Sequence, residues 1–172
     1  MAHERYVNLR RRLIVPLLAV LTLALGAALL AFWLPAYQAE ARQVAAVQRA
    51  CSRGLLAEQE VETIRATYAP GRLPVAARQQ LLVQVEQVLT GAFAGEQLNR
   101  ESDAFFEKLD QDVFYSSPQV TGMTFTQTHL TGATAVANAQ VTDSDGSRWA
   151  YTFTLARVEG EWRVTALVGV SQ

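Results

Sequence analysis

The longest apolar stretch of the chain runs from Leu13 to Leu34 and contains no charged residue. As a helix it would be about 33 Å long, enough to cross a hydrocarbon layer of about 30 Å. Trp33 and Tyr37 stand near its C-terminal end, where aromatic residues gather at membrane interfaces. The pattern therefore predicts a transmembrane helix over residues 13–35, and no comparable run follows in the sequence.

Two other interpretations of this run stay open. A secretory signal peptide has an apolar core of about 7–15 residues and a small-x-small cleavage site, which Ala39, Glu40 and Ala41 would provide. A buried helix of a soluble protein normally keeps a polar face, and this run has none. Its length and its flanking aromatic residues favour a retained membrane anchor.

Basic residues on the N-terminal flank predict how the anchor is oriented. Arg10, Arg11 and Arg12 directly precede the apolar run, whereas the nearest basic residue after it is Arg42. Because cytoplasmic flanks carry the excess of Lys and Arg, residues 1–12 are predicted to form a cytoplasmic tail. The chain is then a single-pass protein of the cell membrane, with its C-terminal domain in the periplasm or outside the cell.

Helical patterns continue after the anchor. Residues 36–72 are predicted to form a helical stalk or linker, because helix-forming residues dominate there and apolar residues recur at spacings of three and four. Gly54 is expected to stop the first helix of this stalk. Two amphipathic helices follow. The first begins near Pro74 and is ended by Gly91 and Gly95, and the second begins near Gln97 or Ser102 and runs to Phe114.

After Pro118 the apolar residues recur at every second position, which is typical of strands. The first strand begins near Met123, and turn signals such as Asp145-Gly146 separate the strands from one another. Three later strands are predicted at about 133–141, 149–156 and 162–170. Short turns between sequential strands predict an antiparallel meander.

The alternation divides this sheet into an apolar face and a face rich in Thr and Ala. The apolar face is predicted to carry Met123, Phe125, Trp149, Tyr151, Phe153, Leu155, Trp162, Val164, Ala166, Val168 and Val170. Two amphipathic helices need such a surface to cover their own apolar sides. The predicted fold class is α+β: an N-terminal transmembrane helix and helical stalk, then a domain over residues 73–172 in which two amphipathic helices pack on a curved four-stranded antiparallel meander.

Composition removes several classes of function. Four of the 15 Lys and Arg and one of the 16 Asp and Glu precede the apolar run, which leaves a net charge of −4 and no electrostatic case for nucleic acid. Cys51 is the single cysteine and is predicted to be a small buried residue, with an intermolecular disulfide or a reactive thiol as alternatives. The two histidines, His3 and His129, are predicted on opposite sides of the membrane, and phosphate loops and nucleophile elbows are absent from the sequence. The sequence therefore predicts no catalytic residue, no cofactor and no metal.

The last hairpin resembles a pattern of the nuclear-transport-factor-2-like (cystatin-like) superfamily, in which a charged glycine turn is followed by Trp, a basic residue and an aliphatic residue. Here these residues are Gly160, Trp162, Arg163 and Val164. The resemblance covers about Leu73–Val170 and implies a cone between helices and sheet, reduced because the segment before the first strand is short. With a single anchor, the chain also resembles membrane-anchored members: inner-membrane scaffold subunits of type IV secretion and proteins associated with lipid-transfer machines.

Catalytic members of that superfamily place an Asp or His base inside the cone. The resemblance makes five residues candidates here: Asp103, Asp110, Asp112, Tyr115 and His129. His129 follows Met123 and Phe125 in alternation, so it is predicted at the end of the apolar row. No two of these residues are expected to have opposed environments, so no enzyme is predicted. An isomerase- or dehydratase-like enzyme with His129 or Asp110 as base is one alternative.

The Thr-rich face of the predicted sheet is a candidate partner surface, because it is flat, β-prone and uncharged. Its residues include Thr124, Thr126, Thr128, Thr152 and Thr154. Ordinary solvent, a second copy of the chain or another subunit of a membrane complex would each fit this face. The sequence thus predicts a non-catalytic accessory or scaffold subunit that holds an extracytoplasmic docking domain near the lipid bilayer. A binding protein for a small apolar ligand is the other alternative.

Overall fold

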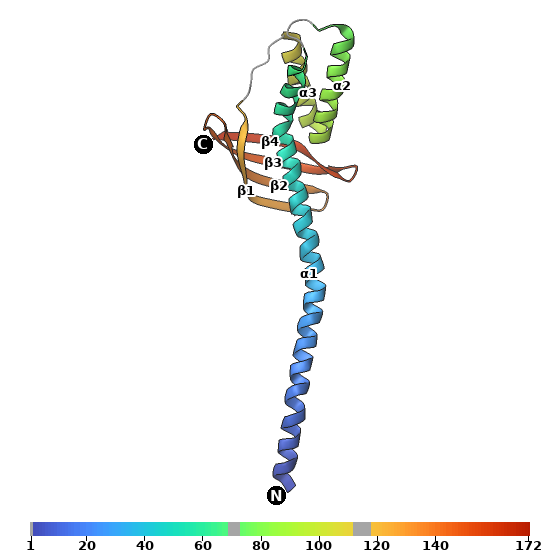
Figure 1. Cartoon of the computed structure of the whole chain (residues 1–172), viewed down its shortest axis with the longest axis vertical. Coiled ribbons are helices and arrows are strands. Elements are labelled where there is room, and N and C mark those ends of the chain that lie inside the picture. Colours follow the sequence, from blue (N-terminus) through green and yellow to red (C-terminus); the bar gives the residue numbers. More distant parts are fainter. Residues whose placement is uncertain (1, 69–72, 112–117) are drawn as a thin grey trace. The chain divides into compact units, whose positions relative to one another are not determined.

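A computed structural model confirms an α+β fold of three helices followed by a four-stranded antiparallel sheet (Figure 1). It describes residues 2–68, 73–111 and 118–172, with side chains described from residue 20 onward in the first of these ranges. The elements in chain order are α1 (Ala2–Ala66), α2 (Val75–Ala92), α3 (Gly95–Gln111), β1 (Val120–Thr131), β2 (Thr134–Asp143), β3 (Arg148–Val158) and β4 (Glu161–Ser171). Contacts divide the chain into two compact units, residues 1–43 and 44–172.

The second unit begins with the C-terminal part of α1, residues 44–66, which the sequence assigned to a stalk. Val47, Cys51 and Ala57 have no exposed surface there, and all three belong to the hydrophobic core. A narrow stripe of small apolar residues fits a stalk and a domain helix equally well, so the pattern alone did not separate the two. In the structure, the folded domain starts near residue 44.

Gly54 does not stop a helix, because α1 continues through it to Ala66. The glycine is instead a point of close approach between α1 and the sheet. A Cβ atom at this position would lie 2.9 Å from Cγ2 of Val164 and 3.5 Å from Cε1 of Phe93. The missing side chain therefore lets the helix backbone rest on β4.

The turn between α2 and α3 attaches both helices to β4. α2 continues past Gly91, which was expected to help end it, and stops at Ala92. Phe93 then forms a parallel bridge with Val164, and the backbone N of Ala94 donates a hydrogen bond to the Val164 oxygen at 2.9 Å. This bridge fixes the helical pair against the edge of the sheet.

The sheet is an antiparallel meander with the strand order β1-β2-β3-β4, as predicted. Its last turn has two residues, Glu159 at φ 54° and Gly160 at φ 87°. Two successive positive φ values match the twist of a tight hairpin, and glycine takes the second without steric cost. In the turn before it, Oδ1 of Asp145 accepts hydrogen bonds from the backbone N and Oγ of Ser147 at 2.9 and 2.6 Å.

An extra residue in β4 exchanges the faces of its second half. Thr165 is left over between the pairs that Thr154 and Leu155 form with β4. Because alternation shifts by one at such a bulge, every later side chain points to the opposite face. Three residues predicted on the apolar face are therefore exposed on the other one: Ala166, Val168 and Val170. Leu167 instead packs against the core.

The apolar face predicted for β3 is confirmed. Phe153 and Leu155 are fully buried, and Trp149 and Tyr151 continue the row half-buried. Ring centroids in the row are 6.3 Å apart between Trp149 and Tyr151, and 6.0 Å apart between Tyr151 and Phe153. The Tyr151 ring lies over Gly169 of β4, where a Cβ would meet it at 2.6 Å. The inner part of this row thus belongs to the hydrophobic core.

Candidate functional site: the outer face of the sheet

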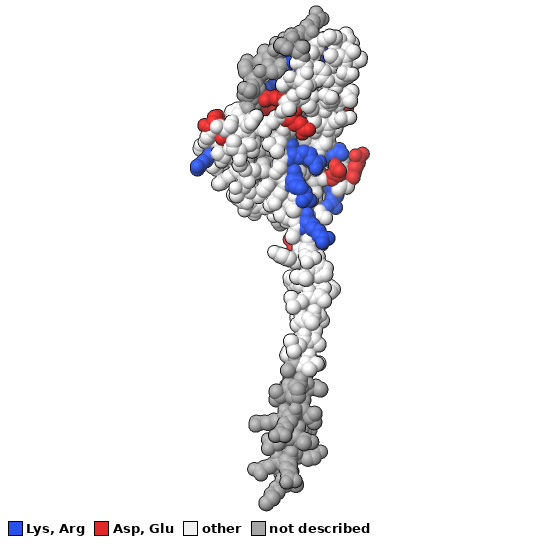
Figure 2. Space-filling model, in the orientation of Figure 1, with Lys and Arg blue, Asp and Glu red and all other residues white. Residues whose placement is uncertain are grey.

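The face of the sheet turned away from the helices, here called the outer face, carries no Asp, Glu, Lys or Arg in its three central rows. Its residues are Thr124, Thr126, Gln127, His129, Val136, Asn138, Gln140, Ala150, Thr152, Thr154, Ala166, Val168 and Val170. Arg148 and Arg163 lie one row beyond each end of this surface. The side of the molecule seen in Figure 2 differs, because Lys and Arg form a line over α1 there.

Three valines stand exposed within the outer face. Val136, Val168 and Val170 keep 43%, 59% and 61% of their residue surface accessible. The register places Val168 opposite Thr152 and Val170 opposite Ala150, so no charged side chain separates them. Val168 and Val170 are next neighbours on this face of β4, whereas Thr154 of β3 lies between Val136 and β4. Exposed apolar residues that lie together mark interaction sites more often than isolated ones do.

Polar side chains of the outer face hold one another in place. The Thr152 Oγ1 donates a hydrogen bond to Oδ1 of Asn138 at 3.0 Å, and Nδ2 of Asn138 donates to Oε1 of Gln127 at 3.5 Å. This chain of contacts crosses three strands, from β3 to β1. These two hydrogen bonds link side chains of three neighbouring strands on the outer face.

The structure brings four of the five predicted threonines together on this face. Thr124, Thr126 and Thr152 are exposed, and Thr154 is half-buried. Thr128 was placed wrongly: it pairs with the buried Ala137, and Nε2 of Gln48 in α1 donates a hydrogen bond to its Oγ1 at 3.4 Å. A register irregularity between Phe125 and Gln127 turns Thr128 toward the helices.

The same irregularity corrects the placement of His129, which is exposed on the outer face and does not extend the apolar row. The other described candidate bases do not join it. Asp103 is exposed on α3, and Oδ1 of Asp110 forms a surface ion pair with Nη2 of Arg78 at 2.5 Å. Predictions for residues 112–115, Asp112 and Tyr115 among them, fall outside the described residues. The three described bases thus form no common site.

Cys51 lies inside the core and faces no solvent. Burial raises the pKa of its thiol to about 12, which keeps it protonated at neutral pH. A protonated, enclosed thiol is a poor nucleophile, which supports the structural role expected for it. Within the described ranges, no group of three or more His, Cys, Asp or Glu residues could hold a metal ion.

A polar cluster joins α1 and α3 at the edge of the core, and sequence patterns did not point to it. Nζ of Lys108 contacts Oε1 of Glu58 at 2.8 Å, and Nε2 of the buried Gln97 donates to Oε1 of Glu101 at 2.7 Å. Burial raises the pKa of Glu101, and the nearby Glu58 charge raises it further, against the opposing hydrogen bond from Gln97. These groups satisfy one another, so the cluster contributes to helix pairing.

The part of α1 before residue 44 is long and apolar enough to cross a membrane. In the most apolar 18-residue segment of this helix, no residue is buried by the rest of the protein. Phe32 and Trp33 keep 82% and 70% of their surface exposed. A core helix of a soluble protein would be mostly buried, whereas this segment is exposed. Leu34 and Tyr37 are exposed as well. The side chains of four other predicted residues lie outside the described part: Leu13, Arg10, Arg11 and Arg12.

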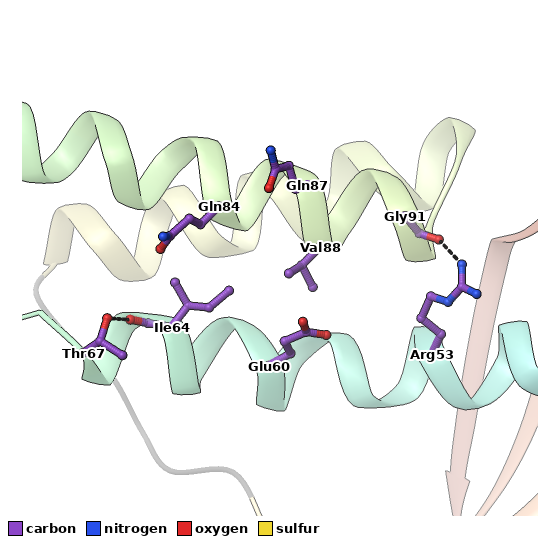
Figure 3. A pocket seen from close by; sticks show the side chains of 8 residues that line it. All are labelled: Arg53, Glu60, Ile64, Thr67, Gln84, Gln87, Val88 and Gly91. Carbon is purple, nitrogen blue, oxygen red and sulfur yellow. Dashed lines mark hydrogen bonds between the residues drawn. The ribbon is translucent and has the colours of Figure 1, made fainter.

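A groove of about 570 Å³ lies between α1 and α2 (Figure 3). Ile64 of α1 and Val88 of α2 both point into it from opposite sides. At one end, Nη1 of Arg53 donates a hydrogen bond to the Gly91 carbonyl at 3.1 Å. The domain's own side chains thus already span this groove, which marks it as a seam between two helices.

Two solved structures that resemble part of this chain are described as NTF2-like proteins of unknown function. The protein from Shewanella baltica OS155 is 27% identical, with a TM-score of 0.31, over 41% of this chain and 55% of its own. The protein from Silicibacter pomeroyi DSS-3 is 21% identical, with a TM-score of 0.30, over 41% of this chain and 56% of its own. No family model and no curated protein matches the chain. This chain thus spans little more than half the length of these two neighbours, and its function rests on its own residues.

Proposed function

We propose that this chain is a non-catalytic accessory or scaffold subunit of a larger membrane complex. The observation that carries the proposal is the exposed apolar part of α1. No residue of its most apolar segment is buried by the rest of the protein. Exposed rings such as Phe32 and Trp33 need a non-aqueous environment, and a lipid bilayer supplies one. The basic residues 10–12 favour a cytoplasmic N-terminus, which puts the domain on the periplasmic or extracellular side.

The outer face is the proposed docking surface of this subunit. Its central rows have no charged side chain that a partner would have to desolvate, and burying an unpaired charge is costly. Val168 and Val170 supply apolar area, while the Thr152–Asn138 pair supplies hydrogen-bonding groups. A central apolar patch within a polar surround is how many protein interfaces are built.

A non-catalytic role is consistent with the rest of the domain. Asp103, Asp110 and His129 are exposed at separate places, and none of them faces the core. Phe153 and Leu155 are fully buried in the space where a cone ligand would sit. These features of the domain favour a docking role over catalysis in an internal active site.

Purification of the full chain in mild detergent tests the docking role. We expect stoichiometric partners to be recovered from the native membrane, and we expect Val168→Lys to reduce that recovery. Val75→Lys is the matched control, since Val75 is 75% exposed on α2, away from the outer face. Recovery of a clean monomer, or equal recovery with both variants, would contradict the proposal.

The fate of the anchor is tested separately by mass spectrometry of the mature chain. A retained anchor predicts an uncleaved N-terminal region and a chain that stays in the membrane fraction after an alkaline carbonate wash. A mature N-terminus just after Ala41 would show that the apolar run is a signal peptide. The membrane part of the proposal would then be wrong.

A further inference from the structure

A second groove lies between α2 and α3, and its lining is more apolar than that of the α1–α2 seam. It has a volume of about 380 Å³, and its lining residues are Leu82, Val85, Glu86, Leu89, Thr90, Leu98, Asn99, Ser102, Phe105 and Phe106. The α2 residues follow the spacing i, i+3, i+4, i+7 and i+8, and the α3 residues also span eight positions. The groove therefore runs along two turns of each helix, about 12 Å.

Apolar side chains at this groove remain open to solvent. Phe106 keeps 46% of its surface exposed and meets the buried Phe105 edge to face, with centroids 6.0 Å apart. Leu82 and Leu98 are half-buried on the two walls. Unlike the α1–α2 seam, where Arg53 crosses to Gly91, this groove presents its leucine and phenylalanine surface outward.

Glu86 gives the groove its charge. It is the one charged residue in the lining, it is exposed, and within the described ranges no cation or side-chain donor partners its carboxylate. Arg78, the other charged residue of α2, is already paired with Asp110. A binding partner that placed a Lys or Arg beside Glu86 would gain a contact that the chain itself does not make.

We propose that the α2–α3 groove binds an amphipathic helix of a partner subunit. The partner's apolar face would carry large side chains at i, i+3 or i+4, and i+7, because that spacing matches a groove two turns long. A Lys or Arg on its flank would pair with Glu86. The inference rests on the proposed scaffold function and adds a second docking surface with a defined partner chemistry.

The test uses the full chain in lipid nanodiscs and a displayed library of 18-residue helical peptides as the probe. Selected peptides are expected to share the apolar spacing and a basic flanking residue. Asn99→Arg, on the groove rim, should weaken their binding at least about tenfold, through repulsion of the basic flank. Glu86→Gln should weaken binding about two- to fivefold, as expected for an exposed charge pair.

Asp103→Asn is the matched control for Glu86→Gln. It also removes one exposed carboxylate from a helix, but Asp103 does not line the groove. Its peptide affinity should equal that of the wild type. Glu86→Lys should restore binding to peptides in which the basic flank has been changed to Glu. Because all three positions are exposed, the thermal unfolding of each variant should stay close to that of the wild type.

Three outcomes of the binding test would overturn the inference: no enrichment of peptides, equal binding to all variants, or loss of binding in Asp103→Asn as well. A change of oligomeric state with Asn99→Arg would point to a second copy as the occupant and would also overturn it. Recovery of partners that depends on Val168, together with failure of the peptide test, leaves the scaffold function standing. Failure of both experiments removes the scaffold function itself.

Discussion

The two parts of α1 both contain apolar residues, but those of the first part are exposed and those of the second part are buried. Before residue 44, Phe32 and Trp33 are mostly exposed, whereas after it Val47 and Cys51 have no exposed surface. The later part finds its apolar partner inside the domain, against the sheet and α2. The earlier part has no such partner among the described residues. The role of an apolar helix is thus clear only when its surroundings are known. The two parts of α1 require different surroundings.

Truncation breaks this comparison most severely. A chain beginning at Val44 should fold and unfold cooperatively, while a chain beginning at Leu73 should not. The shorter chain loses five core residues: Val47, Ala50, Cys51, Ala57 and Val61. Burial of one valine contributes about 1.5–3 kcal/mol, so the total loss rivals a typical stability of about 5–15 kcal/mol. Chemical denaturation followed by circular dichroism checks this, and cooperative unfolding of residues 73–172 would disprove it.

Thiol labelling compares the two parts of α1 with one reagent. Because the pKa of Cys51 is raised to about 12, its thiolate fraction at pH 8 should be roughly a thousandfold below that of an ordinary thiol. An alkylating reagent should therefore spare Cys51 in the native chain and modify it after denaturation. Ala39→Cys, at an exposed position of the earlier part, should react at once. Equal rates at both sites would show that residues 44–66 are not buried.

A pair of identical substitutions measures what burial contributes in each part. Val47→Ala should destabilise the domain by about 2 kcal/mol, since two buried carbon groups are lost and a small cavity remains. Val20→Ala removes the same groups at a position that is 66% exposed, so domain stability should change by less than about 0.5 kcal/mol. Urea denaturation of both variants gives the two values. Similar values would erase the contrast between the two parts.

The two glycines of α1 give the smallest expected effect. Gly54→Ala should cost about 1–2 kcal/mol, because its Cβ would press on the buried, stiff Val164 side chain. This is the net cost, after a gain of about 1 kcal/mol in helix propensity is subtracted. A Cβ atom added at Gly26 would have no neighbour within 4 Å. The melting temperature of Gly26→Ala should therefore equal or exceed that of the wild type. A stabilised Gly54→Ala variant would mean that α1 and β4 are not in close contact.

Much of the fold follows from the sequence, and the errors have physical causes. The meander, the two amphipathic helices and the apolar face of β3 come directly from hydrophobic period and turn residues. Thr128 and Val168 were assigned to the wrong faces, because a bulge adds one residue without any change in composition. Gly54 was misread as a helix stop because a glycine at a close contact looks the same in sequence as a glycine at a helix end.

The sequence pattern predicted most of the threonines of the outer face, but it did not predict that Val168 and Val170 lie there. Thr124 and Thr152 were placed by simple alternation, but Val168 and Val170 reach the same face only through the extra residue in β4. The α2–α3 groove carried no sequence signal either, since its lining residues look like ordinary core positions of two amphipathic helices. Three-dimensional packing decides which of those positions stay open.

The two edge strands of the sheet, β1 and β4, affect whether the protein aggregates at high concentration. A regular, unpaired edge strand is a template on which strands of other molecules can add, which is the first step toward fibrils. β1 has two breaks in its ladder, beside Val120 and beside Phe125, and β4 is occupied at Val164 by the Phe93 bridge. Extra residues in a strand also distort its free edge, so β1 is an irregular template, and the Phe93 bridge blocks part of β4. Folded copies should meet through side chains, and stacking into a growing cross-β fibre is disfavoured from both ends of the sheet.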